Sequence, residues 1–208
     1  MPHLPNSIYE FANFVNREEI DVAAFCEMEN RTFRTNFLSH PDLFSSLTRL
    51  KNYRYFPTTS IKGWLSQGNM INSRFPILDS QIHKLPRGRR FLCRTDINFR
   101  GSNIIFFATH LSLNKYARAK QLNEVRRIIE DIEEPIILAG DFNAGKDELN
   151  VLDNLHKIPD HYSFPSWNPK KSIDHIFCSE QFRIVESYAV SMKISDHLPV
   201  VARLRFAK

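Results

Sequence analysis

The stretch PIILAGDFNAG, residues 135–145, is an apolar run that stops at a glycine, a carboxylate and an amide. Pro135 opens the run, and the apolar residues after it are typical of a buried strand. Gly140 permits a close turn. Asp141 and Asn143 are expected to face one rim, because alternate residues of an extended chain share a side. The stretch therefore indicates either an ordinary turn or one wall of a site.

Helical periodicity and short apolar strands alternate along the rest of the chain, which is the pattern of an α/β layered fold. The sequence predicts helices over residues 7–18 (with Ser7 as N-cap), 41–50 and 116–132. It predicts strands over 20–27, 53–58, 68–78 (the last two broken by proline), 135–143, 172–179 and 195–206, and a hairpin over 91–110 that turns at 100–102. At 208 residues we expect a single domain spanning residues 1–208.

The chain is mildly basic, with a net charge of +5 and a pI near 9.2. Excess positive charge favours anionic partners, and phosphates are the obvious class. Because 28 basic side chains are offset by 23 acidic ones, charge does not choose between nucleic acid, lipid headgroup and nucleotide. Hydrophobic residues make up 42% and charged residues 25%, as in soluble globular proteins rather than disordered or membrane ones.

Three cysteines, Cys26, Cys93 and Cys178, lie far apart in apolar stretches without metal-binding spacing. We expect buried free thiols rather than disulfides or zinc ligands. No apolar stretch reaches membrane-spanning length, and the first residues lack the pattern of a signal peptide. These features favour a reducing, cytoplasmic location without stable membrane insertion, and a monomer.

Polar side chains occur at the ends of several predicted strands: Glu27, His110, Asp141, Asn143, Asp174, Asp196 and His197. Taken singly, each has an ordinary structural explanation. An Asp after Gly is usually a turn or a helix cap, and a lone His is usually a satisfied side chain. Five such strand ends in one chain favour a site, because strand ends in layered α/β folds converge at one rim.

The residue types at these ends indicate a reaction class. Hard oxygen ligands such as Glu27 and Asp196 suit Mg²⁺ or Mn²⁺, which neutralises phosphate charge and activates water. No Cys or His cluster has zinc spacing. A histidine oriented by a carboxylate can act in acid–base chemistry, and an amide can hold a phosphoryl oxygen. The combination indicates metal-assisted phosphoester hydrolysis.

The ordered motifs resemble the endonuclease/exonuclease/phosphatase superfamily, which includes apurinic/apyrimidinic endonucleases, pancreatic-type deoxyribonucleases, poly(A) deadenylases, neutral sphingomyelinases and inositol polyphosphate 5-phosphatases. The matching segments are DVAAFCEMEN, GNMINSRFPI, FFATHLS, ILAGDFNA, SIDHIF and SDHLPVVARL, in the order of the family and over roughly residues 8–205. Each motif is weak alone, whereas together they are specific. The resemblance implies a four-layer α/β sandwich, two mainly antiparallel or mixed sheets flanked by helices, with the site at one rim.

The resemblance also implies roles for individual residues. Glu27 would bind the divalent metal, Mg²⁺ or Mn²⁺, with help from Asp196. Asp141 would position or deprotonate the attacking water, and Asn143 would contact the scissile phosphate.

The two histidines would act on the phosphate itself. His197 would serve as acid–base or charge stabiliser, held by Asp174. His110 would contact a phosphoryl oxygen, because this position is His in the phosphatase and sphingomyelinase branches and Tyr in the base-excision endonucleases.

Two features depart from the family pattern. The metal-binding Glu of the family usually follows Gln, whereas Cys26 precedes Glu27 here. The family also begins with a strand that carries a metal-supporting Asn, but this sequence starts almost at the first helix, and Asn6 has no strand around it. Either the start was placed downstream of the true one, which we favour, or this is a natural short form with weakened metal binding.

The substrate stays open between classes. A nuclease acting on nucleic acid fits the basic balance and the aromatic–basic stretches RLKNYRYF (49–56) and FPSWNPKK (164–171), although Tyr53, Tyr55 and Trp167 could equally pack in the core. PRGRR could be a solvated turn. A phosphatase or phosphodiesterase for a lipid headgroup or small phosphoester is favoured by His110. A binding protein that kept the fold but lost turnover is the third alternative.

Overall fold

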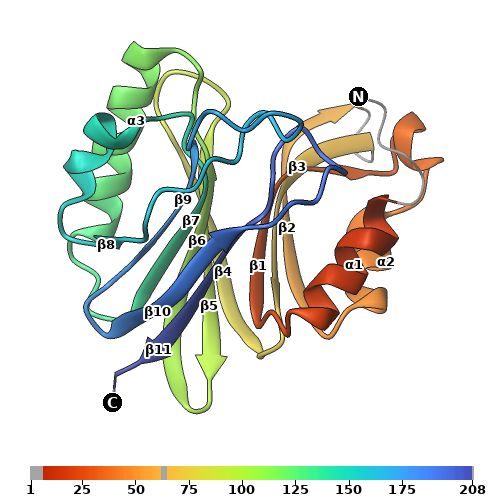
Figure 1. Ribbon diagram of the computed structural model, residues 1–208, viewed down its shortest axis with the longest axis horizontal. Helices are drawn as coiled ribbons and strands as arrows, with labels where there is room; N and C mark the ends of the chain where they lie inside the picture. The colour runs from red at the N-terminus through yellow and green to blue at the C-terminus, as the bar shows by residue number, and fades with distance from the viewer. Residues whose placement is uncertain (1–6, 62–64, 208) are drawn as a thin grey trace.

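The computed structural model describes residues 7–61 and 65–207 as a layered arrangement of two helical layers around two β layers (Figure 1). Helices α1 (Ser7–Arg17) and α2 (His40–Leu47) cover one side, and α3 (Lys115–Ile129) covers the opposite side. Short 3₁₀ turns η1 (Phe33–Thr35) and η2 (Lys146–Leu152) lie in the connections. The predicted α/β sandwich of sheets flanked by helices is thus confirmed.

The layer beside α3 is a six-stranded mixed sheet. Its order is β4 (Ile77–Lys84), β5 (Phe91–Phe99), β6 (Ser102–His110), β7 (Ile136–Asp141), β9 (Asp174–Cys178), β8 (His156–Lys157). Only β6 and β7 pair in parallel, and α3 makes the crossover between them. The other pairs are antiparallel, so the end of β7 and the start of β9 share one edge.

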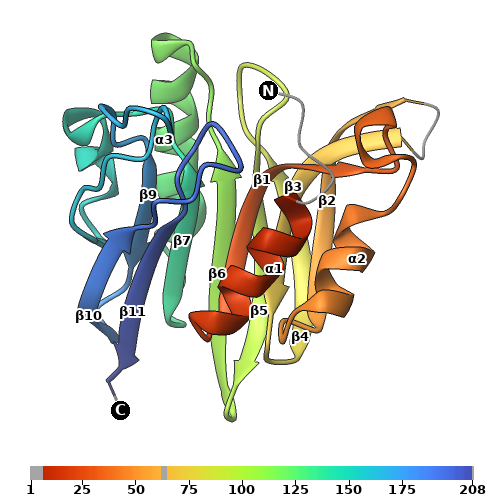
Figure 2. The same cartoon turned by 45° about the vertical axis from the view of Figure 1, so that its right-hand side comes forward.

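The layer beside α1 and α2 consists of two smaller antiparallel sheets. One is three-stranded in the order β1 (Val22–Asn30), β3 (Leu65–Ser73), β2 (Asn52–Ile61). The other contains β10 (Phe182–Ala189) and β11 (Val200–Phe206). No ladder joins β1 to β11 in the described ranges, and residues of both strands line a cavity of about 1440 Å³. Figure 2 shows β10 and β11 on the left of this layer and β1, β2 and β3 on its right.

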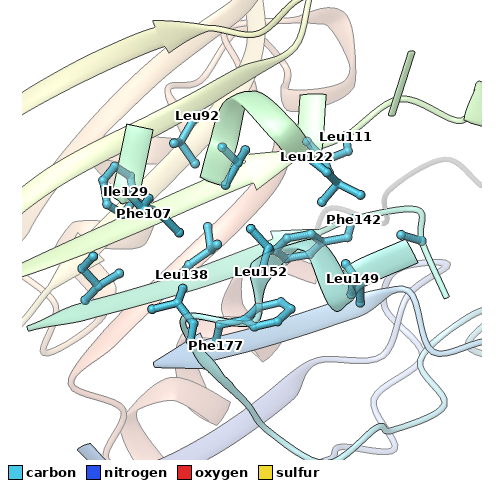
Figure 3. Packing of buried hydrophobic residues seen from close by; sticks show 14 of the residues in the cluster. Leu92, Phe107, Leu111, Leu122, Ile129, Leu138, Phe142, Leu149, Leu152 and Phe177 are labelled. Atoms are coloured by element: carbon cyan, nitrogen blue, oxygen red, sulfur yellow. The ribbon is translucent and has the colours of Figure 1, made fainter. Parts of the chain in front are cut away.

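The main hydrophobic core lies between α3 and the six-stranded sheet (Figure 3). Leu122 and Ile129 of α3 pack with Phe107 and Leu138 of the central strands, and all four are at most 2% exposed. Burying such side chains contributes about 1.5–3 kcal/mol each. This packing fixes β6 and β7, which carry much of the site.

Several predicted elements are confirmed and others need correction. The 91–110 hairpin turns at Arg100 and Gly101, both with positive φ, as a two-residue turn requires. The prediction that a strand ends at Glu27 is wrong, because β1 bulges there and continues to Asn30. The prediction that proline breaks the 53–58 strand is also wrong, because β2 runs through Pro57 on a sheet edge, beside a register shift.

The remaining expectations about the polypeptide concern its ends, thiols and hydropathy. Ser7 is the first residue of α1 rather than a cap ahead of it, and Asn6 lies outside the described residues. Cys26, Cys93 and Cys178 are all free cysteines, and the last two are buried. Within the described ranges, none of the helices combines the length and apolarity needed to cross a membrane.

Candidate active site

Three neighbouring strands of the large sheet bring three predicted site residues into one row. His110 is paired with Asp141 in the parallel β6–β7 register, and Asp141 is paired with Asp174 in the antiparallel β7–β9 register. Residues in register on adjacent strands project to the same face. The ends of β6 and β7 and the start of β9 therefore place an imidazole and two carboxylates side by side.

Gly140 allows β6 and β7 to approach closely just before this row. Its φ is +153°, and a Cβ atom there would lie 1.9 Å from the carbonyl oxygen of Thr109. Only glycine avoids both the backbone strain and the clash. The glycine predicted to permit a close turn instead permits a close contact between strands.

Asn143 reaches the same rim by a turn and not by strand alternation. Strand β7 ends at Asp141, and Asn143 has a left-handed φ of 49°. Its backbone N–H donates to Asp141 Oδ1 at 2.9 Å, and its Nδ2 donates to the carbonyl of Leu111 at 3.0 Å. Asn tolerates this conformation better than most residues, and these bonds fix its amide beside Asp141.

His197 and Asp174 form a hydrogen-bonded pair. His197 Nδ1 lies 2.8 Å from Asp174 Oδ2, and the Ser163 hydroxyl donates to the same oxygen at 2.5 Å. Burial lowers the pKa of His197, but the hydrogen bond and charge of Asp174 outweigh it and raise the pKa to about 9. The His197 ring also packs on Phe164 with centroids 4.9 Å apart. His197 is therefore a cation at neutral pH.

Asp141 lies opposite this pair and is only 7% exposed. Ligand atoms of Asp141, Asp174 and His197 lie within 4.8 Å of one another. Burial and the charge of Asp174 raise the pKa of Asp141 to about 7, against the opposing effects of His197 and the Asn143 N–H. A carboxylate with this pKa can accept a proton near neutral pH.

His110 bridges Asp141 and Glu27. Its Nε2 lies 3.4 Å from Asp141 Oδ2, and its Nδ1 lies 3.7 Å from Glu27 Oε1. Burial lowers the pKa of His110 to about 4, and the positive charges of Arg90 and His197 act in the same direction. His110 is therefore neutral where His197 is charged.

The two predicted metal ligands border the cavity but lie outside the tight three-residue cluster. Glu27 sits at the bulge of β1 with φ of 58°, and its side chain is 59% exposed. Asp196 lies in the loop before β11, where Ser195 Oγ donates to its carboxylate at 3.2 Å. All seven predicted site residues line the same cavity, so the structure brings them to one rim.

Some site residues escaped the sequence analysis, and others have a structural role. Ser163 lies in a loop without periodicity, so no pattern signalled its bond to Asp174. Cys26 Sγ donates to the Thr109 carbonyl at 3.4 Å and ties β1 to β6. The residue after Asp174, His175, faces the core, where its ring nitrogen lies 3.0 Å from the Ala144 carbonyl.

The three aromatic residues considered for base stacking lie in two different environments. Tyr53 and Tyr55 pack against the core beneath α1 and α2, and their hydroxyls bond Asp42 and Ser66 respectively. Trp167 is 55% exposed, next to Ser166, whose N–H donates to the Asp196 carbonyl. Of these three aromatic residues, the tryptophan alone is largely exposed, one residue from a contact with the Asp196 loop.

A family model described as the Endonuclease/Exonuclease/phosphatase family matches residues 6–197. The chain belongs to this family. The match covers every residue of the site, from Glu27 to His197. No curated protein sequence matches the chain significantly.

Solved structures share the fold at low sequence identity. An endonuclease/exonuclease/phosphatase from Beutenbergia cavernae DSM 12333 has a TM-score of 0.76 at 20% identity, over 96% of this chain and 66% of that one. A humanised D. rerio TDP2 has a TM-score of 0.77 at 17% identity, over 96% and 91%. A mannosyl-6-phosphatase from Bacteroides thetaiotaomicron VPI-5482 has a TM-score of 0.74 at 16% identity, over 97% and 91%. This chain thus spans just under two thirds of the first of these proteins.

Proposed function

We propose that this protein hydrolyses phosphoester bonds with the help of a divalent metal, and that its substrate is a phosphodiester in nucleic acid. The observation that carries the proposal is the close approach of Asp141 to the His197–Asp174 pair. Asp141 can accept a proton near neutral pH, and His197 opposite it is a cation. Family membership supports the reaction class, since its members are phosphoesterases.

The donor atoms fit a hard divalent cation at Glu27 and Asp196. The tight cluster offers a poorer place, because His197 is protonated near neutral pH and Asp174 already accepts bonds from His197 and Ser163. Glu27 is exposed, and among the residues that the structure describes its carboxylate has only His110 as a close polar partner, so its oxygens are available. Its carboxylate and that of Asp196 match the oxygen ligands that Mg²⁺ and Mn²⁺ prefer. When bound, such an ion neutralises phosphate charge and activates water.

The residues of the chain then divide the chemistry. Asp141 holds the attacking water and takes its proton, consistent with a pKa of about 7. His197, kept protonated by Asp174, stabilises the negative charge that develops on a phosphoryl oxygen.

Two further side chains position the phosphate. The Nδ2 group of Asn143 donates to the Leu111 carbonyl at 3.0 Å and to Asp141 Oδ2 at 3.3 Å, so its orientation is already fixed. Exchange of the longer bond to Asp141 for one to a phosphoryl oxygen lets the amide contact the phosphate. His110, neutral and 3.4 Å from Asp141, contacts a second phosphoryl oxygen.

Nucleic acid is the preferred substrate because the chain carries a net charge of +5 and Trp167 is exposed beside the site loop. An aromatic face next to a phosphate site can stack on a base. A small phosphoester is the second candidate. His110 and the structural likeness to a mannosyl-6-phosphatase favour it.

Hydrolysis of bis-p-nitrophenyl phosphate in Mg²⁺ or Mn²⁺ tests the reaction class. We expect turnover that chelation by EDTA abolishes and that Asp141→Ala and His197→Ala each reduce about 10²–10⁴-fold, the range for acid–base groups. Asp160→Ala is a matched control, because Asp160 contacts Lys157 and His175 and not the site. DNA, RNA, sphingomyelin and sugar phosphates then define the substrate.

If the wild-type protein with either metal is as inactive as both variants, the hydrolase proposal fails. The chain would then be a binding protein with this fold.

A further inference from the structure

Arg90 lies beside the catalytic row without belonging to it. It immediately precedes β5, and its carbonyl accepts a bond from the Leu85 N–H at 2.9 Å, which closes the β4–β5 connection. The antiparallel register pairs Leu92 with Thr109, so Arg90 lies two positions beyond this pair, alongside the end of β6 where His110 lies. The backbone of Arg90 is thus anchored next to the site.

The Arg90 side chain borders the same cavity as the site residues and is half-buried. Its positive charge lowers the pKa of both His110 and Asp141, so the guanidinium lies close enough to act on two residues of the row. Two other arginines that border this cavity are occupied, and a third, Arg205, lies near the far end of β11, away from His197. Arg118 makes a bidentate pair with Glu148, and Arg203 pairs with Glu186.

Within residues 7–61 and 65–207, by contrast, Arg90 has no carboxylate within ion-pair distance. A guanidinium without a carboxylate partner, held at the wall of a cavity, retains all five N–H donors for a ligand. Its planar fork matches two oxygens of a phosphate, which an ammonium group cannot do.

We propose that Arg90 is a further anion-binding residue of this site and holds non-bridging oxygens of the substrate phosphate from the His110 side, opposite His197. This inference rests on the proposed function for the identity of the anion. It assigns a specific ligand contact to the PRGRR segment, which the sequence alone left as a solvated turn. In this arrangement the phosphate lies between two cations, one on each side of Asp141.

Binding of inorganic phosphate tests this separately from turnover. Isothermal titration of phosphate into Mg²⁺-loaded protein, and inhibition of bis-p-nitrophenyl phosphate hydrolysis by phosphate, both report the contact. We expect Arg90→Ala to weaken phosphate binding about tenfold to hundredfold, as for loss of a charge-assisted hydrogen bond. Arg90→Lys should recover only part of this, because it restores charge without the fork.

Arg89→Ala is the matched control. Arg89 is the adjacent residue, is exposed and does not border the cavity, so its replacement removes the same charge without the contact. If Arg90→Ala and Arg89→Ala weaken phosphate binding equally, or if neither does, the inference is overturned. Circular dichroism of each variant checks that the fold is retained.

The two proposals fail in different ways. Phosphate binding that depends on Arg90 in a protein without turnover would contradict the hydrolase and leave the anion site standing. Turnover that depends on His197 but not on Arg90, with phosphate inhibition unchanged in Arg90→Ala, would support the hydrolase and contradict the Arg90 assignment. Wild-type protein that binds no phosphate overturns the Arg90 assignment.

Discussion

Nδ1 of His197 lies 2.8 Å from Oδ2 of Asp174, and this carboxylate keeps the imidazole charged in a partly buried position. The pair links the loop before β11 to the start of β9, so two separate sheets contribute to one functional group. The charge state of His197 therefore depends on how these sheets sit together.

Replacement of Asp174 should discharge His197. We expect the pKa of His197, followed by NMR titration of metal-free protein, to be about 9 in the wild type and to fall well below that in Asp174→Asn, where only the charges of Asp141 and Asp196 still oppose burial. Activity at pH 8 should drop about 10²-fold or more. Asp160→Asn is the control and should leave the His197 titration in place. An unchanged pKa in Asp174→Asn would rule out Asp174 as the cause.

Acid should destabilise the protein in part through His175. Burial lowers the pKa of His175 below its ordinary value of 6.5, against the hydrogen bond to Ala144. As pH falls below about 6.5, the unfolded state takes up a proton that the folded state does not, so the free energy of unfolding decreases. The slope from one such group is at most about 1.4 kcal/mol per pH unit.

Urea denaturation of wild type and His175→Gln between pH 7 and pH 5 isolates this contribution. The difference in unfolding free energy between the two proteins should narrow as pH falls, since only the wild type carries the titrating group. A constant difference across the range would show that His175 does not contribute.

Gly140→Ala should destabilise the fold by at least about 2 kcal/mol. The substitution imposes a positive φ on a residue with a side chain and drives Cβ into the Thr109 carbonyl. Gly145→Ala is the matched control, because a Cβ there meets nothing within 4 Å. Guanidinium denaturation measures both, and equal stabilities would contradict the close approach of β6 and β7.

The three thiols should react slowly with DTNB at pH 8 in the folded protein. Burial raises the pKa of Cys93 to about 12 and raises those of Cys26 and Cys178, which suppresses the reactive thiolate. Unfolding in guanidinium should make all three thiols react with DTNB at the same fast rate. Fast reaction in the native state would show that these strands open readily.

Local pattern was sufficient to predict the strands that deliver the site, because apolar runs such as the one before Asp141 are bounded by polar residues. The row of His110, Asp141 and Asp174 required more. It follows from register between strands separated by α3 and by a long loop, which no local pattern encodes.

Other parts of the site depend on contacts distant in sequence. The bulge at Glu27 interrupts a regular apolar run without a glycine to mark it, so the strand was predicted to end there. Ser163 reaches Asp174 from an irregular loop. Arg90 gains its place from the register of a hairpin, whereas its neighbours in sequence suggest only a turn.

In the part of the chain that the structure describes, β1 and β11 each have one edge without a strand partner, and this has a consequence for metal affinity. Among the described strands, β1, which carries Glu27, pairs with β3 alone, and β11, which follows Asp196, pairs with β10 alone. The two carboxylates are therefore attached to separate sheets, and both border one cavity. Linkage between two binding events is reciprocal. A polypeptide segment that bridged both edges would therefore raise the affinity of the site for the cation, and the bound cation would raise the affinity for the segment by the same factor.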